Sequence, residues 1–212
     1  MRYVLTVGLG LLLAACSSKK EESARPETGV DINKNPLGVI GALGNIASDM
    51  ESFQKEIENM KAVETVHFST LLAALPDPPA GWNADEPKGS TTQLGDFKTS
   101  EAHRVYTSGT GQEVEVTIQD WAFHRAVYLP FLMAARLSQE SSDGYNRGIR
   151  IAGDPGREEY QTESKSGERT VLRKKRYCTK IRIEGLPASA FDEWYARVKV
   201  DALPAGSQTS PN

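Results

Sequence analysis

Apolar and polar residues alternate strictly over residues 113–119 of this 212-residue chain. Val114, Val116 and Ile118 are each separated from the next by one polar or charged residue. Successive side chains of a β-strand point to opposite faces of its sheet, so this period of two predicts a strand with one buried face. A fold built around such strands must provide a second layer that covers the apolar side.

The neighbouring segments predict further short strands joined by turns. Strand candidates are 91–94, 102–108 and 113–121, followed by a four-stranded meander over 148–184. Gly, Pro, Ser and Lys residues mark the turns between them, at 108–111, 153–156, 164–167 and 174–175. In the last strand one face carries Tyr177, Thr179, Ile181 and Ile183, and the other carries Cys178, Lys180, Arg182 and Glu184.

Three segments of the same region predict helices. Residues 69–75 indicate a brief helix that the following prolines end, and residues 126–137 predict an apolar core helix kinked or started at Pro130. A last helix follows Pro187, with Ser189 and Asp192 at capping-box spacing. Its apolar face consists of Phe191, Trp194, Tyr195 and Val198.

The predicted fold class is therefore α+β. We expect an antiparallel sheet of about six or seven strands packed with helices, in the order α-βββ-α-ββββ-α, preceded by a long amphipathic helix over residues 36–62. Asn35 and Pro36 suit the start of that helix. Its apolar stripe consists of Leu43, Ile46, Met50, Phe53, Ile57 and Met60. The stripe is compatible with packing on its own domain, with a partner helix or with a membrane surface, although its acidic polar face disfavours anionic lipid.

The first residues match the pattern of a bacterial lipoprotein signal. Arg2 is followed by an apolar run of about ten residues, well below the roughly 20 that a membrane-spanning helix needs. Leu13-Ala14-Ala15-Cys16 resembles a lipobox, so we expect residues 1–15 to be removed and Cys16 to be lipidated. The resemblance also implies attachment to the membrane through this lipid, and Ser17 after the cysteine favours the outer membrane of a Gram-negative envelope.

The remaining boundaries follow from local composition. Residues 16–35 contain almost nothing apolar and predict a flexible tether spanning about 25 Å on average. Residues 63–203 would form the α+β domain, and residues 204–212 a disordered tail. The expected location is the cell envelope, facing the periplasm if the source is Gram-negative.

Charge and cysteine content limit the function classes. A formal net charge of -3 and a pI near 5.7 argue against general nucleic-acid binding, so no nucleic-acid partner is expected. Cys16 and Cys178 are the two cysteines, and lipid on Cys16 would leave Cys178 without an intrachain disulfide partner. Cys178 is then either buried under a neighbouring helix or exposed and able to pair with another chain.

A series of short motifs extends over roughly residues 66–200. It comprises Phe68-x-x-Leu71-Leu72…Leu75-Pro76, Gly81-Trp82, Lys88-Gly89…Ser100-x-Ala102-x-Arg104-x-Tyr106, Val114-x-Val116-x-Ile118-x-Asp120, Asp143-Gly144-Tyr145 and Ile183-Glu184-Gly185. This layout is similar to a group of secreted bacterial proteins and lipoproteins of unknown function, and that resemblance implies no reaction and no catalytic residue. The order of elements also resembles PsbP-like α/β/α folds, and a fold resemblance transfers no function.

Candidate catalytic and metal-binding residues are few. His67, His103 and His124 are the only histidines, and none of them pairs with another at the spacing of a zinc site. Glu158 and Glu159 are adjacent in a predicted strand, so they point to opposite faces and cannot act together on one substrate. We therefore predict no metal, no cofactor and no catalytic residue.

One charged segment is a candidate contact. Arg173, Lys174, Lys175 and Arg176 form a basic run at a predicted hairpin tip. The run is compatible with a solvated turn that resists aggregation, or with an anion contact to lipid head groups, cell-wall polymer or an acidic partner.

The preferred hypothesis is a non-catalytic, lipid-anchored envelope protein that binds an envelope protein or a cell-wall polymer through its long helix or basic hairpin. One alternative is an envelope enzyme with an unfamiliar site near Trp82, Trp121 and His124. The other alternative is a carrier of lipid or another small ligand, which requires an apolar cavity beneath the helix predicted at 126–137.

Overall fold

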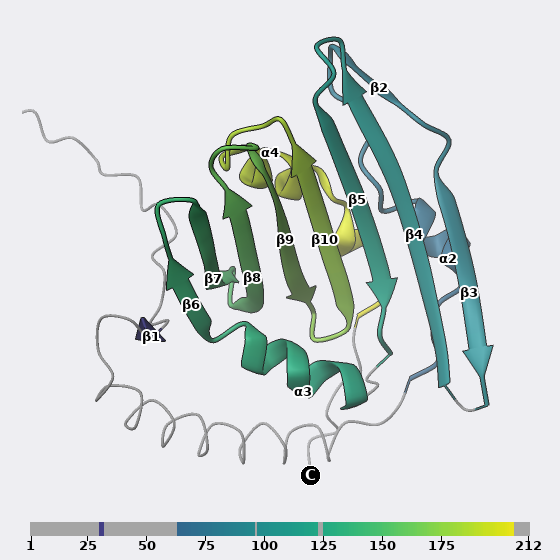
Figure 1. Ribbon diagram of the computed structural model, residues 1–212. Coiled ribbons are helices and arrows are strands. Elements are labelled where there is room, and N and C mark those ends of the chain that lie inside the picture. Colours follow the sequence, from purple (N-terminus) through teal and green to yellow (C-terminus); the bar gives the residue numbers. More distant parts are fainter. Residues whose placement is uncertain (1–29, 32–62, 96, 123–124, 206–212) are drawn as a thin grey trace, which may run out of the picture.

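The computed structural model describes residues 30–31, 63–95, 97–122 and 125–205 (Figure 1). The predictions for the signal at 1–15, for Cys16, for the helix at 36–62, and for 206–212 within the predicted tail lie outside these residues. Two residues of the predicted tether are described: Val30–Asp31 form strand β1, which pairs in parallel with Leu137 and Ser138.

An antiparallel sheet forms the body of the domain, as the sequence predicts. Its strands are β2 (Trp82–Ala84), β3 (Lys88–Leu94), β4 (Phe97–Ser108), β5 (Glu113–Asp120), β6 (Leu137–Glu140), β7 (Gly144–Ile151), β8 (Asp154–Gln161), β9 (Ser166–Arg173) and β10 (Tyr177–Glu184). Across the sheet the order is β1-β6-β7-β8-β9-β10-β5-β4, and β2 and β3 pair with successive parts of β4.

Two meanders meet in the middle of this sheet. The first consists of β3, β4 and β5, and the second runs from β6 to β10. Helix α3 (Arg125–Ala134) carries the chain from β5 to the far edge, and β10 then closes against β5 over its full length. The last strands of the two meanders are therefore neighbours, although the residues that they pair lie far apart in sequence.

The main core lies on one face of the sheet. Helices α2 (Phe68–Leu72) and α4 (Ala190–Arg197) and the short helix η1 (Val200–Ala202) cover this side, which we call the helical face (Figure 1). The alternating residues of β5 point into it and are fully buried, as predicted, and so are the residues expected on the inner face of β10. Phe191 and Trp194 of α4 complete the layer, which confirms the predicted apolar face of the last helix.

The opposite side, here called the open face, is covered only at one end. There Tyr128 of α3 and Leu172 of β9 form a small second core against Trp121 and Phe131. Cys178 lies beside Leu172 across the β9–β10 pair and is buried, which decides between the two alternatives for this residue. Burial also raises the pKa of the Cys178 thiol to about 12, so at neutral pH the group stays protonated.

Several predicted elements differ from the observed ones. The predicted number of six or seven strands is too low, because it omits β2 and β6. These strands have only three and four residues and no alternating apolar pattern. The turns predicted at 153–156 and 164–167 lie slightly earlier, since Asp154 already begins β8 and Ser166 begins β9. Short strands and turns both contain many polar residues, so the sequence pattern alone does not distinguish them well.

The predictions for helices α3 and α4 also need correction. Helix α3 packs at the end of the sheet and not in the main core, with Pro130 inside the helix and 48% of Met133 exposed. In α4 the side chain of Ser189 makes no capping bond, because the backbone at Ser189 is already helical. Asp192, predicted to complete that cap, instead binds Arg169 of β9.

Candidate functional site

A buried ion pair joins β5 to the segment just before β10. Asp120 occupies the next inward position after Ile118, so the strand alternation directs its carboxylate to the helical face. It is 0% exposed, and its partner Arg176 is 4% exposed. The guanidinium binds both carboxylate oxygens, with Nε–Oδ1 at 2.8 Å and Nη2–Oδ2 at 2.7 Å.

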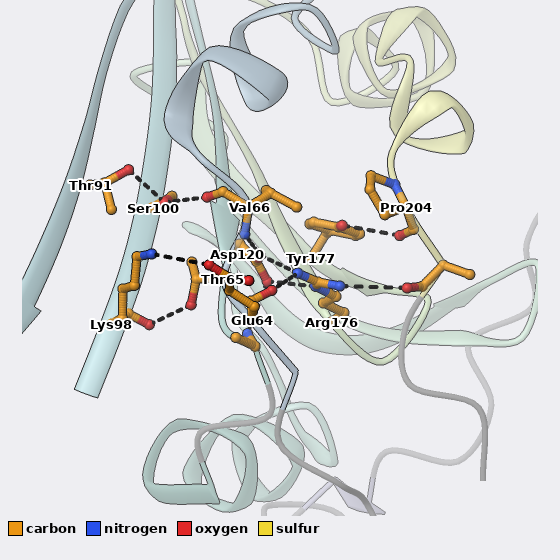
Figure 2. Close-up of polar contacts among 12 residues, drawn as sticks. Glu64, Thr65, Val66, Thr91, Lys98, Ser100, Asp120, Arg176, Tyr177 and Pro204 are labelled. Atoms are coloured by element: carbon orange, nitrogen blue, oxygen red, sulfur yellow. Dashed lines mark hydrogen bonds and ion pairs between the residues drawn. The ribbon is translucent and has the colours of Figure 1, made fainter. Parts of the chain in front are cut away.

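Backbone groups complete this pair. The N–H groups of Val66 and Ala122 donate to Asp120 at 2.8 and 2.9 Å, and Arg176 Nη2 donates to the carbonyl of Glu64 at 2.8 Å (Figure 2). These bonds satisfy charges whose burial would otherwise be costly. They also tie the segment just before α2 to the centre of the sheet.

The C-terminal segment is held at the same place. Tyr177 Oη donates to the carbonyl of Pro204 at 3.0 Å, and Arg176 Nη1 lies 3.5 Å from the carbonyl of Ala205. On the other flank Ser100 Oγ donates to Val66 O at 2.5 Å (Figure 2). We call the residues Asp120, Arg176 and Tyr177, with the backbone that they bind, the terminal clamp, because residues 64–66 and 204–205 meet there.

A second buried carboxylate lies between β7, β8 and β9. Glu158 is 1% exposed and accepts from Arg169 Nε at 2.6 Å, from Arg147 Nη2 at 2.8 Å and from Tyr145 Oη at 2.7 Å. Arg169 also binds Asp192 of α4 at 2.6 Å and lies over the ring of Phe191. This set, the core network, links the sheet to α4. Glu159 points to the other face, as predicted.

The basic run predicted as an anion contact is engaged within the fold. Arg173 binds Asp154 and Asp201, each at 3.0 Å, and Arg176 belongs to the terminal clamp. Lys174 Nζ donates to three carbonyls at the end of η1, at 3.1–3.3 Å. Lys175 accepts from Tyr128 Oη through its carbonyl, while its side chain is exposed. Arg173, Lys174 and Arg176 thus hold residues 200–205 against the sheet. Anion binding by the basic run stays a prediction.

The two tryptophans of the enzyme alternative lie in different cores. Trp82 packs edge-on against Trp194 on the helical face, with ring centres 5.0 Å apart. Trp121 lies in the other core, 5.7 Å from Tyr128, and His124 lies outside the described residues. The described part of the chain contains no group of three or more His, Cys, Asp and Glu side chains placed to hold a metal ion.

The space beneath α3, where the carrier alternative requires a cavity, holds packed aromatic rings. Trp121 meets Phe131 at 5.6 Å and Tyr128 at 5.7 Å between ring centres, both nearly perpendicular. Leu172 closes the cluster from the sheet side. These contacts make the region a small core.

A hollow of about 670 Å³ indents the open face at the ends of β8, β9 and β10. Its charged and amide side chains are Glu159, Gln161, Glu168, Arg182 and Glu184, and glycine backbone lines much of the rest. We call it the polar hollow. Gly167 is required in its floor, because a Cβ atom at this position would lie 2.2 Å from the carbonyl oxygen of Glu159.

Each carboxylate of the polar hollow has a basic neighbour. Glu184 lies 2.8 Å from Arg182, Glu159 lies 3.2 Å from Arg157, and Glu168 lies 3.6 Å from Lys180. All these residues lie on the polar sides of strands, so the sequence pattern identifies their orientation. The pairing register that gathers them is not visible in the sequence, and the hollow was therefore missed.

The polar hollow and the terminal clamp lie at opposite ends of the same strands. Strand β10 begins at Tyr177 in the clamp and ends at Glu184 in the hollow. Eight residues of antiparallel strand span about 24 Å from first to last. The side of the domain that holds Glu64–Val66 and Pro204–Ala205 is therefore remote from the hollow.

Comparisons of the chain with known protein families, with curated proteins and with solved structures gave no match. Among the described residues, no helix combines the length and apolar character needed to cross a membrane. The class that the geometry of the described residues defines is an antiparallel α+β domain with paired internal charges and a polar hollow.

Proposed function

We propose that this chain is a lipid-anchored protein of the cell envelope whose α+β domain binds a hydrophilic partner at the polar hollow. The observation that carries the proposal is the opposition between hollow and clamp. The chain that leads from Cys16 meets the domain first at Val30–Asp31, beside the start of β6, and again at Glu64–Val66, beside the clamp. A domain anchored from that side directs the polar hollow away from the membrane, towards other envelope components.

The lining of the hollow supports binding in preference to catalysis. Its carboxylates are neutralised by Arg157, Lys180 and Arg182, so they provide hydrogen-bonding groups and not an uncompensated acid or base. Exposed ion pairs of this kind exchange partners at little cost, since each contributes only about 0–1 kcal/mol. A protein surface or a cell-wall polymer offers the matching polar groups.

The anchor is tested by metabolic labelling with an alkyne fatty acid. We expect label on the wild-type chain and on a Cys178→Ser variant, and loss of label together with release from the membrane fraction for Cys16→Ser. Equal labelling of Cys16→Ser and wild type would contradict lipidation at this residue.

The binding surface is tested by site-specific photocrosslinking in intact cells. A photoreactive residue at Gln161 would sample the polar hollow, and the same residue at Arg197, exposed at the end of α4, is the matched control. We expect specific adducts from position 161 only, identified by mass spectrometry as protein or glycan. Identical adduct patterns at the two positions would exclude the hollow as the contact.

A further inference from the structure

Strand β3 has an uncovered edge. Its residues Lys88–Leu94 pair with β4 on one side, and among the described residues no strand pairs with the other side. The far edge of the sheet differs, because β1 lies along β6 there. The remaining part of the β4 edge is occupied by β2. The outer side of β3 is thus the longest open edge in the described sheet.

The backbone groups available on this edge follow from the hairpin register. Leu94 and Phe97 face each other across the two-residue turn, which makes them a hydrogen-bonded pair. Alternate residues then bond β4, and Gly89, Thr91 and Gln93 direct their N–H and C=O groups outwards. Ser108 N–H donating to Gln112 O, at the other end of β4, agrees with the same alternation.

Beyond Lys88 at its start, the edge lacks the features that usually prevent strand addition. Natural edge strands are protected by charges, prolines or bulges. From Gly89 to Gly95 the chain has no charged residue and no proline, and the register of β3 against β4 is continuous. Leu94, at the tip, is 79% exposed.

We propose that β3 pairs antiparallel with β3 of a second copy of this chain, which continues the sheet across a two-fold axis at Thr91. This register places Thr91 opposite its own copy and Gly89 opposite Gln93 of the other copy. All six outward backbone groups of each strand are then paired. No like charges face each other within the strand, because Lys88 lies opposite Leu94. Apart from Lys88 at its start, the strand is uncharged, so it is complementary to itself in this register, as an isologous interface requires.

The pairing depends neither on the lipid nor on the polar hollow, so its test uses the unlipidated chain from residue 16 carrying Cys16→Ser. We expect sedimentation velocity to show a concentration-dependent dimer. Gln93→Pro removes one outward N–H but no bond to β4, and Thr92→Lys adds a charge beside the axis. Each is expected to weaken dimerisation about tenfold or more, whereas Thr107→Lys, at an exposed position of β4 away from β3, leaves it unchanged. Circular dichroism and urea midpoints near those of the parent chain verify folding.

Disulfide trapping tests the register. In the proposed pair Ser90 faces Thr92 of the other copy, so a mixture of the single variants Ser90→Cys and Thr92→Cys should form a crosslinked dimer on mild oxidation. Each variant alone should stay uncrosslinked, and buried Cys178 provides no competing thiol. A monomer at all concentrations, or a dimer that tolerates both edge variants, would overturn the proposal.

Discussion

Asp120 in the terminal clamp and Glu158 in the core network are both carboxylates with at most 1% of the residue exposed, yet they hold different parts of the molecule. Asp120 accepts from one side chain and from the backbone of Val66 and Ala122. Glu158 accepts only from side chains on the neighbouring strands β7 and β9. The first centre fixes residues 64–66 and 204–205, and the second fixes the sheet against α4.

Because the hydrogen-bond partners differ, we expect the protein to tolerate substitution of Asp120 less well than substitution of Glu158. The backbone N–H groups of Val66 and Ala122 would lose their acceptor without Asp120, and Arg176 has no second carboxylate among its contacts. Arg169, in contrast, keeps Asp192 when Glu158 is lost. The clamp should therefore be the more sensitive of two centres that are almost equally buried.

The largest effect is expected for Asp120→Ala. Removing one partner of a buried ion pair leaves the other charge uncompensated, which costs about 3–5 kcal/mol of unfolding free energy. Urea denaturation measures the loss, with Glu184→Ala as a control because its ion pair with Arg182 is exposed. Hydrogen exchange should rise at residues 64–66 and 203–205 before it rises in α4.

Glu158→Gln should cost less, about 2–3 kcal/mol, because Arg169 retains a counter-charge and the glutamine keeps an acceptor. Here the exchange pattern should be reversed, with α4 losing protection and residues 64–66 keeping it. The same pattern in both variants would show that the two centres act as one cooperative unit and would contradict the distinction drawn above.

The stability of the protein at alkaline pH depends on one tyrosine in each centre, Tyr177 in the terminal clamp and Tyr145 in the core network. Burial raises the pKa of Tyr177 to about 12, and burial together with the hydrogen bond to Glu158 raises the pKa of Tyr145. A tyrosine whose pKa is higher in the folded than in the unfolded chain contributes stability that is complete below pH 10 and is lost as pH rises through 12. Stability should therefore fall between pH 10 and 12, and less steeply in Tyr177→Phe. An unchanged urea midpoint across this range would contradict it.

The smallest effect is expected for Asp192→Ala. Its carboxylate binds Arg169, but its side chain is 79% exposed, so the loss should be within about 1 kcal/mol. The loss should also shrink in high salt, because exposed charges are screened. A loss of unfolding free energy equal to that of Glu158→Gln would mean that the exposed Asp192 stabilises the core network as much as the buried Glu158 does.

The alternating strands were predictable and the charged centres were not. The alternating pattern of β5 and β10 identifies their inner faces correctly, because successive side chains of a β-strand point to opposite faces of the sheet. Asp120 continues the inward series of β5, and this was the available signal for a buried carboxylate. Arg176 gave no such signal, since an arginine within a basic run looks like any solvated charge.

The polar hollow and the short strands depend on pairing between distant segments. Glu159 and Glu168 lie on different strands, and only the register of β8 against β9 makes them neighbours. Strand β6 is a strand because β7 pairs with it, not because Leu137–Glu140 alternate. Helix α3 was placed in the core by its composition, although its position at the sheet end is set by the crossover between the two meanders.

The terminal clamp also determines the order in which the domain can be completed. Its bond from Arg176 to the carbonyl of Glu64 joins residues 112 positions apart, and the bond from Tyr177 requires Pro204. Contacts between distant residues form slowly, because the intervening chain must first be brought into place. The segment that is synthesised first in this domain is the one whose native partners arrive last.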